Sequence, residues 1–124
     1  MSVCMKPYVI VNTQFEGAHY WKDAPDHVAF LRDPHRHMFY VKLKIGVEGL
    51  DRDIEILTLK KHINSYIATT LVEVIAKEGW SCEMIADNIA RHICTLYNIY
   101  GLEVEVLEDN ENGGGVMYVR KTSV

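Results

Sequence analysis

The sequence has few cysteines, no surplus of basic charge and no long apolar segment. Only three of its 124 residues are cysteine, and Cys4, Cys82 and Cys94 are widely scattered. An odd number of scattered cysteines does not form the disulfide framework of a small secreted domain. We therefore expect a protein of a reducing compartment, the cytoplasm.

Basic residues do not outnumber acidic ones, and no stretch is built for a membrane. Lysine and arginine number 13 against 17 acidic residues, for a net charge of -4. Proteins that bind the nucleic-acid backbone usually show a basic face, so we expect no nucleic-acid partner. The first residues lack the apolar stretch of a signal peptide, and no segment reads as a transmembrane helix, so we expect no membrane partner.

The remaining composition is that of a globular domain. Hydrophobic residues make up 48% and charged residues 24% of the chain, which is ordinary for such domains. The length suits one hydrophobic core, and no composition shift, repeat or low-complexity segment marks a boundary. We therefore predict a single domain over residues 1–124.

Two strands are predicted in the first half of the chain. Residues 7–16 are rich in β-forming residues, and residues 21–34 contain two prolines and mixed charges, typical of a loop. Residues 35–48 alternate between apolar and polar side chains, the pattern of a strand with one buried face. That predicted buried face carries Phe39, Val41, Leu43, Ile45 and Val47.

Two helices follow. A helical period of apolar residues begins at Ile56, and Gly79 is a plausible end. Ser81 can cap a second helix, which Gly101 closes. The residues expected to face inward are Ile56, Leu59, Ile63, Ile67, Leu71 and Ile75 in the first helix, and Ile85, Ile89, Ile93 and Leu96 in the second.

Two more strands close the chain. Residues 102–108 alternate again, residues 110–115 resemble a hairpin loop, and residues 116–121 supply the last strand. The order predicts an α+β fold: a four-stranded antiparallel sheet with two helices on one face. Free sheet edges invite pairing with another copy, so we expect a homo-oligomer, although a monomer with blunted edges is also possible.

Three histidines form a candidate zinc site. His35 and His37 are two residues apart on a strand, so their side chains point the same way. His19 follows the first strand, which would pair with the second as a hairpin. Three neutral imidazoles with one open position are a catalytic zinc arrangement. The alternative is that these are surface or hydrogen-bonding histidines, which is the favoured interpretation for His62 and His92 on their helices.

Five short segments together resemble one known family. They are residues 15–19 (FEGAH), 35–39 (HRHMF), 55–60 (EILTLK), 81–83 (SCE) and 104–108 (VEVLE). Their order over residues 8–119 is similar to that of the 6-pyruvoyltetrahydropterin synthase and 6-carboxytetrahydropterin synthase family. The resemblance implies a T-fold, ββααββ, whose subunits join their sheets into a barrel.

The resemblance also implies a set of site residues. Zinc would lie on His19, His35 and His37, and a pterin-like ring would be anchored by Glu108 with help from Glu83, Ser81 and Cys82. A carboxylate can accept two parallel N–H bonds from an amidine-like ring edge, so the chemistry is sound. The alternative for Glu108 is a strand-end residue that reaches solvent.

The chain departs from the family where protons are moved. Leu31 stands where family enzymes have a catalytic cysteine, and residues 69–73 (TTLVE) lack the family's Asp-His pair. Asp33, two residues before His35, or zinc-bound water could serve as the base instead.

The leading hypothesis is a zinc-dependent enzyme with lyase-type chemistry on a pterin or related purine-derived ring. The alternatives are a non-catalytic pterin or nucleotide binder, and an oligomer in which zinc is purely structural.

Overall fold

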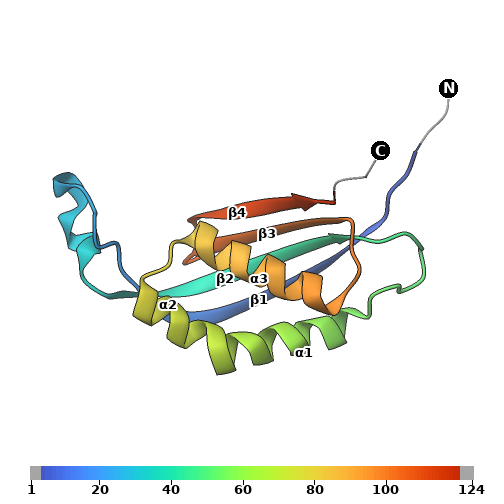
Figure 1. The fold of residues 1–124 in the computed structure, drawn as a ribbon, viewed down its shortest axis with the longest axis horizontal. Helices are drawn as coiled ribbons and strands as arrows, with labels where there is room; N and C mark the ends of the chain where they lie inside the picture. The colour runs from blue at the N-terminus through green and yellow to red at the C-terminus, as the bar shows by residue number, and fades with distance from the viewer. Residues whose placement is uncertain (1–3, 121–124) are drawn as a thin grey trace.

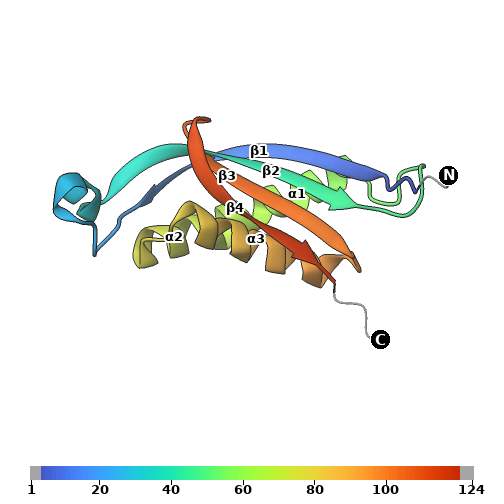
Figure 2. The same cartoon turned by 90° about the horizontal axis from the view of Figure 1, so that it is seen from above.

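The computed structural model describes residues 4–120, which form an α+β fold. Four strands make one antiparallel sheet in the order β1-β2-β3-β4, and the helices pack against one face of it (Figures 1 and 2). This confirms the predicted fold class and the antiparallel sheet. The strands are β1 (Tyr8–His19), β2 (His35–Gly46), β3 (Gly101–Glu108) and β4 (Asn112–Val119).

Alternating apolar residues of the central strands β2 and β3 build the floor of the core. Phe39, Val41, Leu43 and Ile45 are fully buried in β2, and Val104 and Val106 are fully buried in β3. Because side chains alternate across a strand, the residues between them face the other side of the sheet. The buried face predicted for β2 is confirmed, and β3 shows the predicted alternation.

The first strand is longer than predicted, and this positions the site. β1 runs to His19, not to residue 16, and it pairs with β2 along its whole length. Residues 21–34 were expected to be a loop, but they include a 3-10 helix, η1 (Asp26–Arg32), which projects beyond the end of the sheet (Figure 1). The added pairing holds the ends of β1 and β2 together where the histidines lie.

The first predicted helix is interrupted. It consists of α1 (Ile56–Tyr66), a π-helical turn (Ile67–Leu71) and α2 (Val72–Glu78). The apolar residues from 59 to 75 recur every four positions, and such a stripe drifts around a helix of 3.6 residues per turn. The wider π turn compensates for this drift. All five residues of the stripe are therefore buried: Leu59, Ile63, Ile67, Leu71 and Ile75.

The ends of the predicted helices need correction. Ile56, expected inside, is 44% exposed, because Ile54 takes the buried position at that end of α1. The last helix, α3 (Cys82–Leu96), stops before the predicted residue 101, and Leu96 is 41% exposed. The backbone becomes extended at Tyr97, and beyond it Ile99, not Leu96, is the buried residue at this end of α3.

Two predicted helix boundaries are confirmed. Gly79 ends α2 in the left-handed conformation, with φ of 67°. Ser81 caps α3, since its Oγ accepts a hydrogen bond from the Met84 amide.

The final hairpin is tighter than predicted. Residues 113–115 were assigned to a loop, but they belong to β4, and the turn falls at Asp109 and Asn110, whose φ angles are 54° and 59°. A Cβ on Gly113 would lie 1.8 Å from the Val106 carbonyl oxygen, so only glycine allows this close approach of β3 and β4. Position 121, expected to end the last strand, lies outside the described residues.

The sheet has two edge strands, β1 and β4. Pairing of these edges with other copies stays a prediction. Among residues 4–120, no helix has the length and apolar character needed to cross a membrane.

Candidate metal centre

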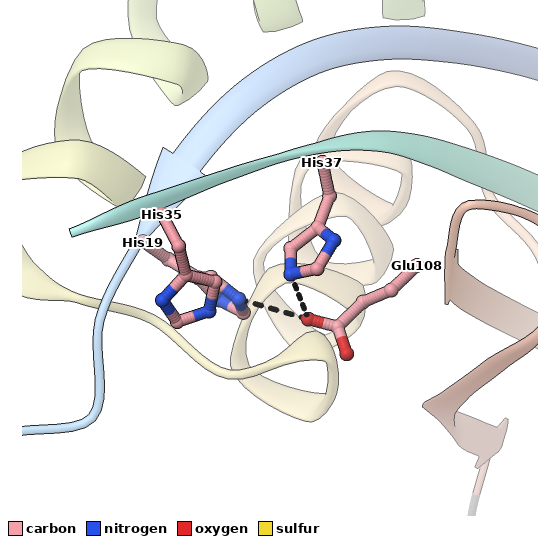
Figure 3. Close-up of side chains that lie close together, drawn as sticks. All are labelled: His19, His35, His37 and Glu108. Carbon is pink, nitrogen blue, oxygen red and sulfur yellow. Dashed lines mark ion pairs between the residues drawn. The ribbon is translucent and has the colours of Figure 1, made fainter. Parts of the chain in front are cut away.

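The three predicted histidines meet at one end of the sheet, together with Glu108 (Figure 3). The centroids of the rings lie 4.6 Å apart for His19 and His35, 5.0 Å for His35 and His37, and 5.3 Å for His19 and His37. One donor atom from each of the four side chains lies within 4.8 Å of all the others. The structure thus forms a group that could hold a metal ion.

Strand register accounts for this arrangement. His19 lies opposite His35, and His37 is two residues further along the same face of β2. β3 neighbours β2 on the edge away from β1, and its last residue, Glu108, pairs with Phe39. The Phe39 ring, fully buried, packs edge-on against His19 and His37 at 5.2 Å and 5.7 Å between centroids. The site therefore lies at one end of the sheet and packs against the buried core through Phe39.

The Nδ1 atom of each histidine ring forms a hydrogen bond with an oxygen atom of the protein. The partners are the Trp80 carbonyl for His19 at 2.7 Å, the Asp33 carbonyl for His35 at 2.9 Å and the Asp109 carboxylate for His37 at 2.8 Å. Carbonyl and carboxylate oxygens only accept hydrogen bonds, so each Nδ1 carries the proton and donates it. In a neutral ring the Nε2 atom is then left with a free lone pair.

The Nε2 atoms of His19 and His37 face Glu108. Its Oε2 atom lies 2.9 Å from His19 Nε2 and 3.0 Å from His37 Nε2 (Figure 3). His19 is only 8% exposed, and its Nε2 is buried without a hydrogen-bond partner among the described residues. A buried, unpaired polar atom is costly. A cation between the four donors would satisfy it. Donors around a tetrahedral zinc ion lie roughly 3.4 Å apart, given bonds of about 2.1 Å, which is somewhat more than the 2.9 Å and 3.0 Å found here.

Asp109 is a supporting residue that the sequence analysis missed. Its Oδ2 atom accepts from His37, and its Oδ1 atom accepts from the Met38 amide at 3.1 Å. The Asp109 amide in turn donates to the Met38 carbonyl at 2.8 Å. The hydrogen bond from His37 and that from Met38 lower the pKa of the Asp109 carboxyl. A carboxylate that fixes a ligating histidine from behind is a common support of metal sites.

A cleft of about 560 Å³ opens beside the centre. It brings together the predicted metal ligands and the predicted ring-binding residues, which come from α3 and β3. Its lining comprises His19, Tyr20, Trp21, Leu31, His35, Gly79, Ser81, Cys82, Glu83, Met84, Glu108, Asn112 and Gly113. Only His37, among the predicted metal and ring-binding residues, is absent from this lining.

Two carboxylates, Glu83 and Glu108, line the cleft together with Cys82. Burial raises the pKa of the Cys82 thiol to about 12, and the negative charges of Glu108 and Glu83 add to this rise. Cys82 is therefore a neutral thiol and no nucleophile at neutral pH.

Asp33 and Leu31 lie differently with respect to the cleft. Asp33 is exposed and is not among the described residues that line the cleft. Its contribution to the centre is the backbone carbonyl that holds His35. Leu31, in contrast, lines the cleft directly. An apolar side chain that cannot exchange a proton thus stands beside the candidate metal ligands.

The fold and the site define an α+β protein with a candidate metal centre of three histidines and one carboxylate. Neither a scan against protein-family models nor a search of curated proteins finds a match for this chain. The family resemblance of the sequence therefore stays a prediction.

Proposed function

We propose that the protein binds zinc on His19, His35 and His37 and takes a pterin-like ring into the adjacent cleft. One observation carries this proposal. The imidazole rings of His19, His35 and His37 and the Glu108 carboxylate converge beside a cleft that is also lined by Cys82 and Glu83 at the start of α3.

Zinc is the metal that best suits the donor set. Neutral imidazoles favour zinc over the hard cations magnesium and calcium, which prefer oxygen ligands. When bound, the ion supplies a Lewis acid that polarises oxygen atoms of a substrate side chain. The residues of the chain supply the orientation: three fixed Nδ1 hydrogen bonds hold the rings before any metal arrives.

The cleft suits a flat ring with N–H donors. Its volume lies within the range of about 300–1,000 Å³ that is typical of small-molecule sites. Glu108 and Glu83 offer carboxylate oxygens to an amidine-like ring edge. Tyr20 and Trp21 line the same cleft and offer aromatic faces for stacking.

The leading form of the proposal is lyase-type chemistry on the ring's side chain, with Asp33 as the group that moves protons. Asp33 would have to turn inward, since its side chain is exposed. The position of Leu31 favours a second form, a non-catalytic binder of a pterin or nucleotide, because Leu31 places no acid or base where it lines the cleft.

Fluorescence titration of the zinc-loaded protein with neopterin tests the ring site. We expect saturable binding that is lost in Glu83→Gln combined with Glu108→Gln, and retained in Glu103→Gln combined with Glu105→Gln on the opposite face of β3. Incubation with dihydroneopterin triphosphate then separates the two forms. If the protein turns this compound over and Asp33→Asn abolishes the turnover, the result supports the enzyme. Binding without turnover supports the non-catalytic binder. Absence of any binding would contradict the ring site.

A further inference from the structure

Glu108 lies where a fourth ligand of a metal ion would lie. Its Oε2 atom is 2.9 Å and 3.0 Å from the Nε2 atoms of His19 and His37. The Nδ1 atoms of these rings already carry the ring protons, so no proton lies between Oε2 and either Nε2 atom in the neutral rings. One donor atom of His35 lies within 4.8 Å of the same atoms, so a single cation could contact all three histidines and Glu108.

Within residues 4–120, the residues around Glu108 in the cleft include histidines but no permanently charged basic side chain. Among the described residues that line the cleft there is no lysine or arginine, and the nearby acidic group is Glu83. The Glu108 side chain is 31% exposed and points inward from the last position of β3. A partly buried carboxylate needs a cationic partner, and a metal ion shared with the neutral histidines would supply it.

We infer that Glu108 is a fourth protein ligand of the centre, so that the ligand-free centre is closed by three histidines and one carboxylate. This inference rests on the proposed zinc site and deepens it. A centre with four protein donors leaves no open position for a substrate.

One carboxylate then has two competing uses. Glu108 holds the metal while the cleft is empty, and it must release the metal before both of its oxygens can accept N–H groups from a ring. Glu108 lines the cleft together with Cys82 and Glu83, so a ring in the cleft can reach it. Ring binding would thus open the fourth position of the metal, and a ligand without N–H donors would leave the centre closed.

Competition with a chromophoric chelator for zinc tests the fourth-ligand role with the metal alone. We expect Glu108→Ala to bind zinc at least about tenfold more weakly than the wild type, by analogy with the loss caused by removing supporting residues. Glu108→Gln, which keeps the shape of the side chain, should also bind more weakly. Glu105→Gln, on the same strand but on the opposite face, should match the wild type.

Substitution of zinc by cobalt gives a second measurement, and a merely structural role of Glu108 would leave its result unchanged. The visible absorption of cobalt should change between the wild type and Glu108→Gln, because water replaces a carboxylate. Unchanged zinc affinity together with an unchanged cobalt spectrum would overturn the inference, while zinc on the three histidines would stand. Absence of zinc binding by the wild type would instead overturn the metal site itself.

Discussion

At the scale of single residues, the candidate centre depends on what holds each histidine as much as on the histidines. Two of the holding groups are backbone carbonyls, of Trp80 and Asp33, and the third is the Asp109 side chain. These contacts fix the tautomer and the direction of each ring. The donors are therefore arranged before a metal binds, which lowers the cost of ordering them.

Replacement of Asp109 by asparagine tests this support. Asparagine tolerates the left-handed conformation of position 109, so the turn should be kept. The amide cannot accept from both His37 and Met38 as the carboxylate does. We expect zinc affinity, measured by chelator competition, to fall by about 10–100-fold.

The control for this variant is Asp51→Asn, in an exposed loop whose carboxylate contacts only Arg52 among the described residues. Nitrogen NMR shifts of the His37 ring should report a loss of the fixed tautomer in Asp109→Asn. Wild-type affinity and an unchanged His37 tautomer would contradict a positioning role for Asp109.

The clustering of the three histidines could be predicted from the sequence, but the groups that hold them could not. His35 and His37 share a strand face by parity, whereas Glu108 was expected to bind a ring and lies among the histidines. Asp109 could not be found in this way, since it meets Met38 across 71 positions of the chain. The only local signal was the Asp109-Asn110 pair, whose residue types tolerate the left-handed turn.

At the scale of elements, the boundary between α2 and α3 forms one wall of the cleft. Gly79 adopts a φ of 67°, and a Cβ there would lie 2.7 Å from the Tyr20 carbonyl oxygen. Gly79 also lines the cleft with Ser81 and Cys82. The chain reversal between the two helices thus depends on a residue without a side chain.

Gly79→Ala should destabilise the protein by at least about 1 kcal/mol, the cost of a left-handed conformation for a residue with a Cβ. The contact with the Tyr20 carbonyl should add to this cost. Urea unfolding followed by circular dichroism measures the change. Gly101→Ala is the matched control, because a Cβ there meets nothing within 4 Å. Equal unfolding midpoints for the two variants would contradict the account of Gly79.

The N-terminus of α1 carries a pH-dependent cap. The Glu55 carboxylate accepts from the Leu57 amide at 2.6 Å, and from the Thr58 amide and hydroxyl at 3.1 Å and 2.7 Å. The Thr58 hydroxyl, followed by the Leu57 amide, lowers the pKa of Glu55 below its ordinary 4.5. The stabilisation is therefore fully present above pH 4.5 and is lost as the pH falls through the lower folded-state pKa.

Glu55→Gln removes this titration. In metal-free protein we expect the stability advantage of the wild type over the variant to shrink as the pH is lowered from 6 to about 3. Urea unfolding at a series of pH values measures this advantage. An advantage that stays constant with pH would show that the Glu55 charge does not stabilise α1.

The element types could be predicted from periodicity, but their interruptions could not. The regular spacing of apolar residues from Leu59 to Ile75 indicated one helix, and the π turn within it arises from packing of that stripe on the sheet. Residues 113–115 looked like a loop because they are glycines. Their role is the close approach to β3, which depends on the pairing partner.

At the scale of the whole molecule, the candidate site lies at one end of the sheet and borders the core. The helices cover one face of the sheet, and η1 projects beyond the end at which β1 finishes with His19 and β2 begins with His35 (Figures 1 and 2). The α+β class could be predicted from the order of the elements. The projecting segment could not, since its prolines and mixed charges indicated only a loop.

The central claim is that His19, His35 and His37 form a zinc site, and calorimetric titration of zinc into metal-free protein tests it most directly. The account predicts one zinc ion per chain for the wild type and for His62→Ala, whose histidine lies on the exposed side of α1. It predicts that His35→Ala loses this binding, together with the rise in melting temperature that zinc gives the wild type. Equal zinc binding and an equal rise in melting temperature for His35→Ala and the wild type would contradict it.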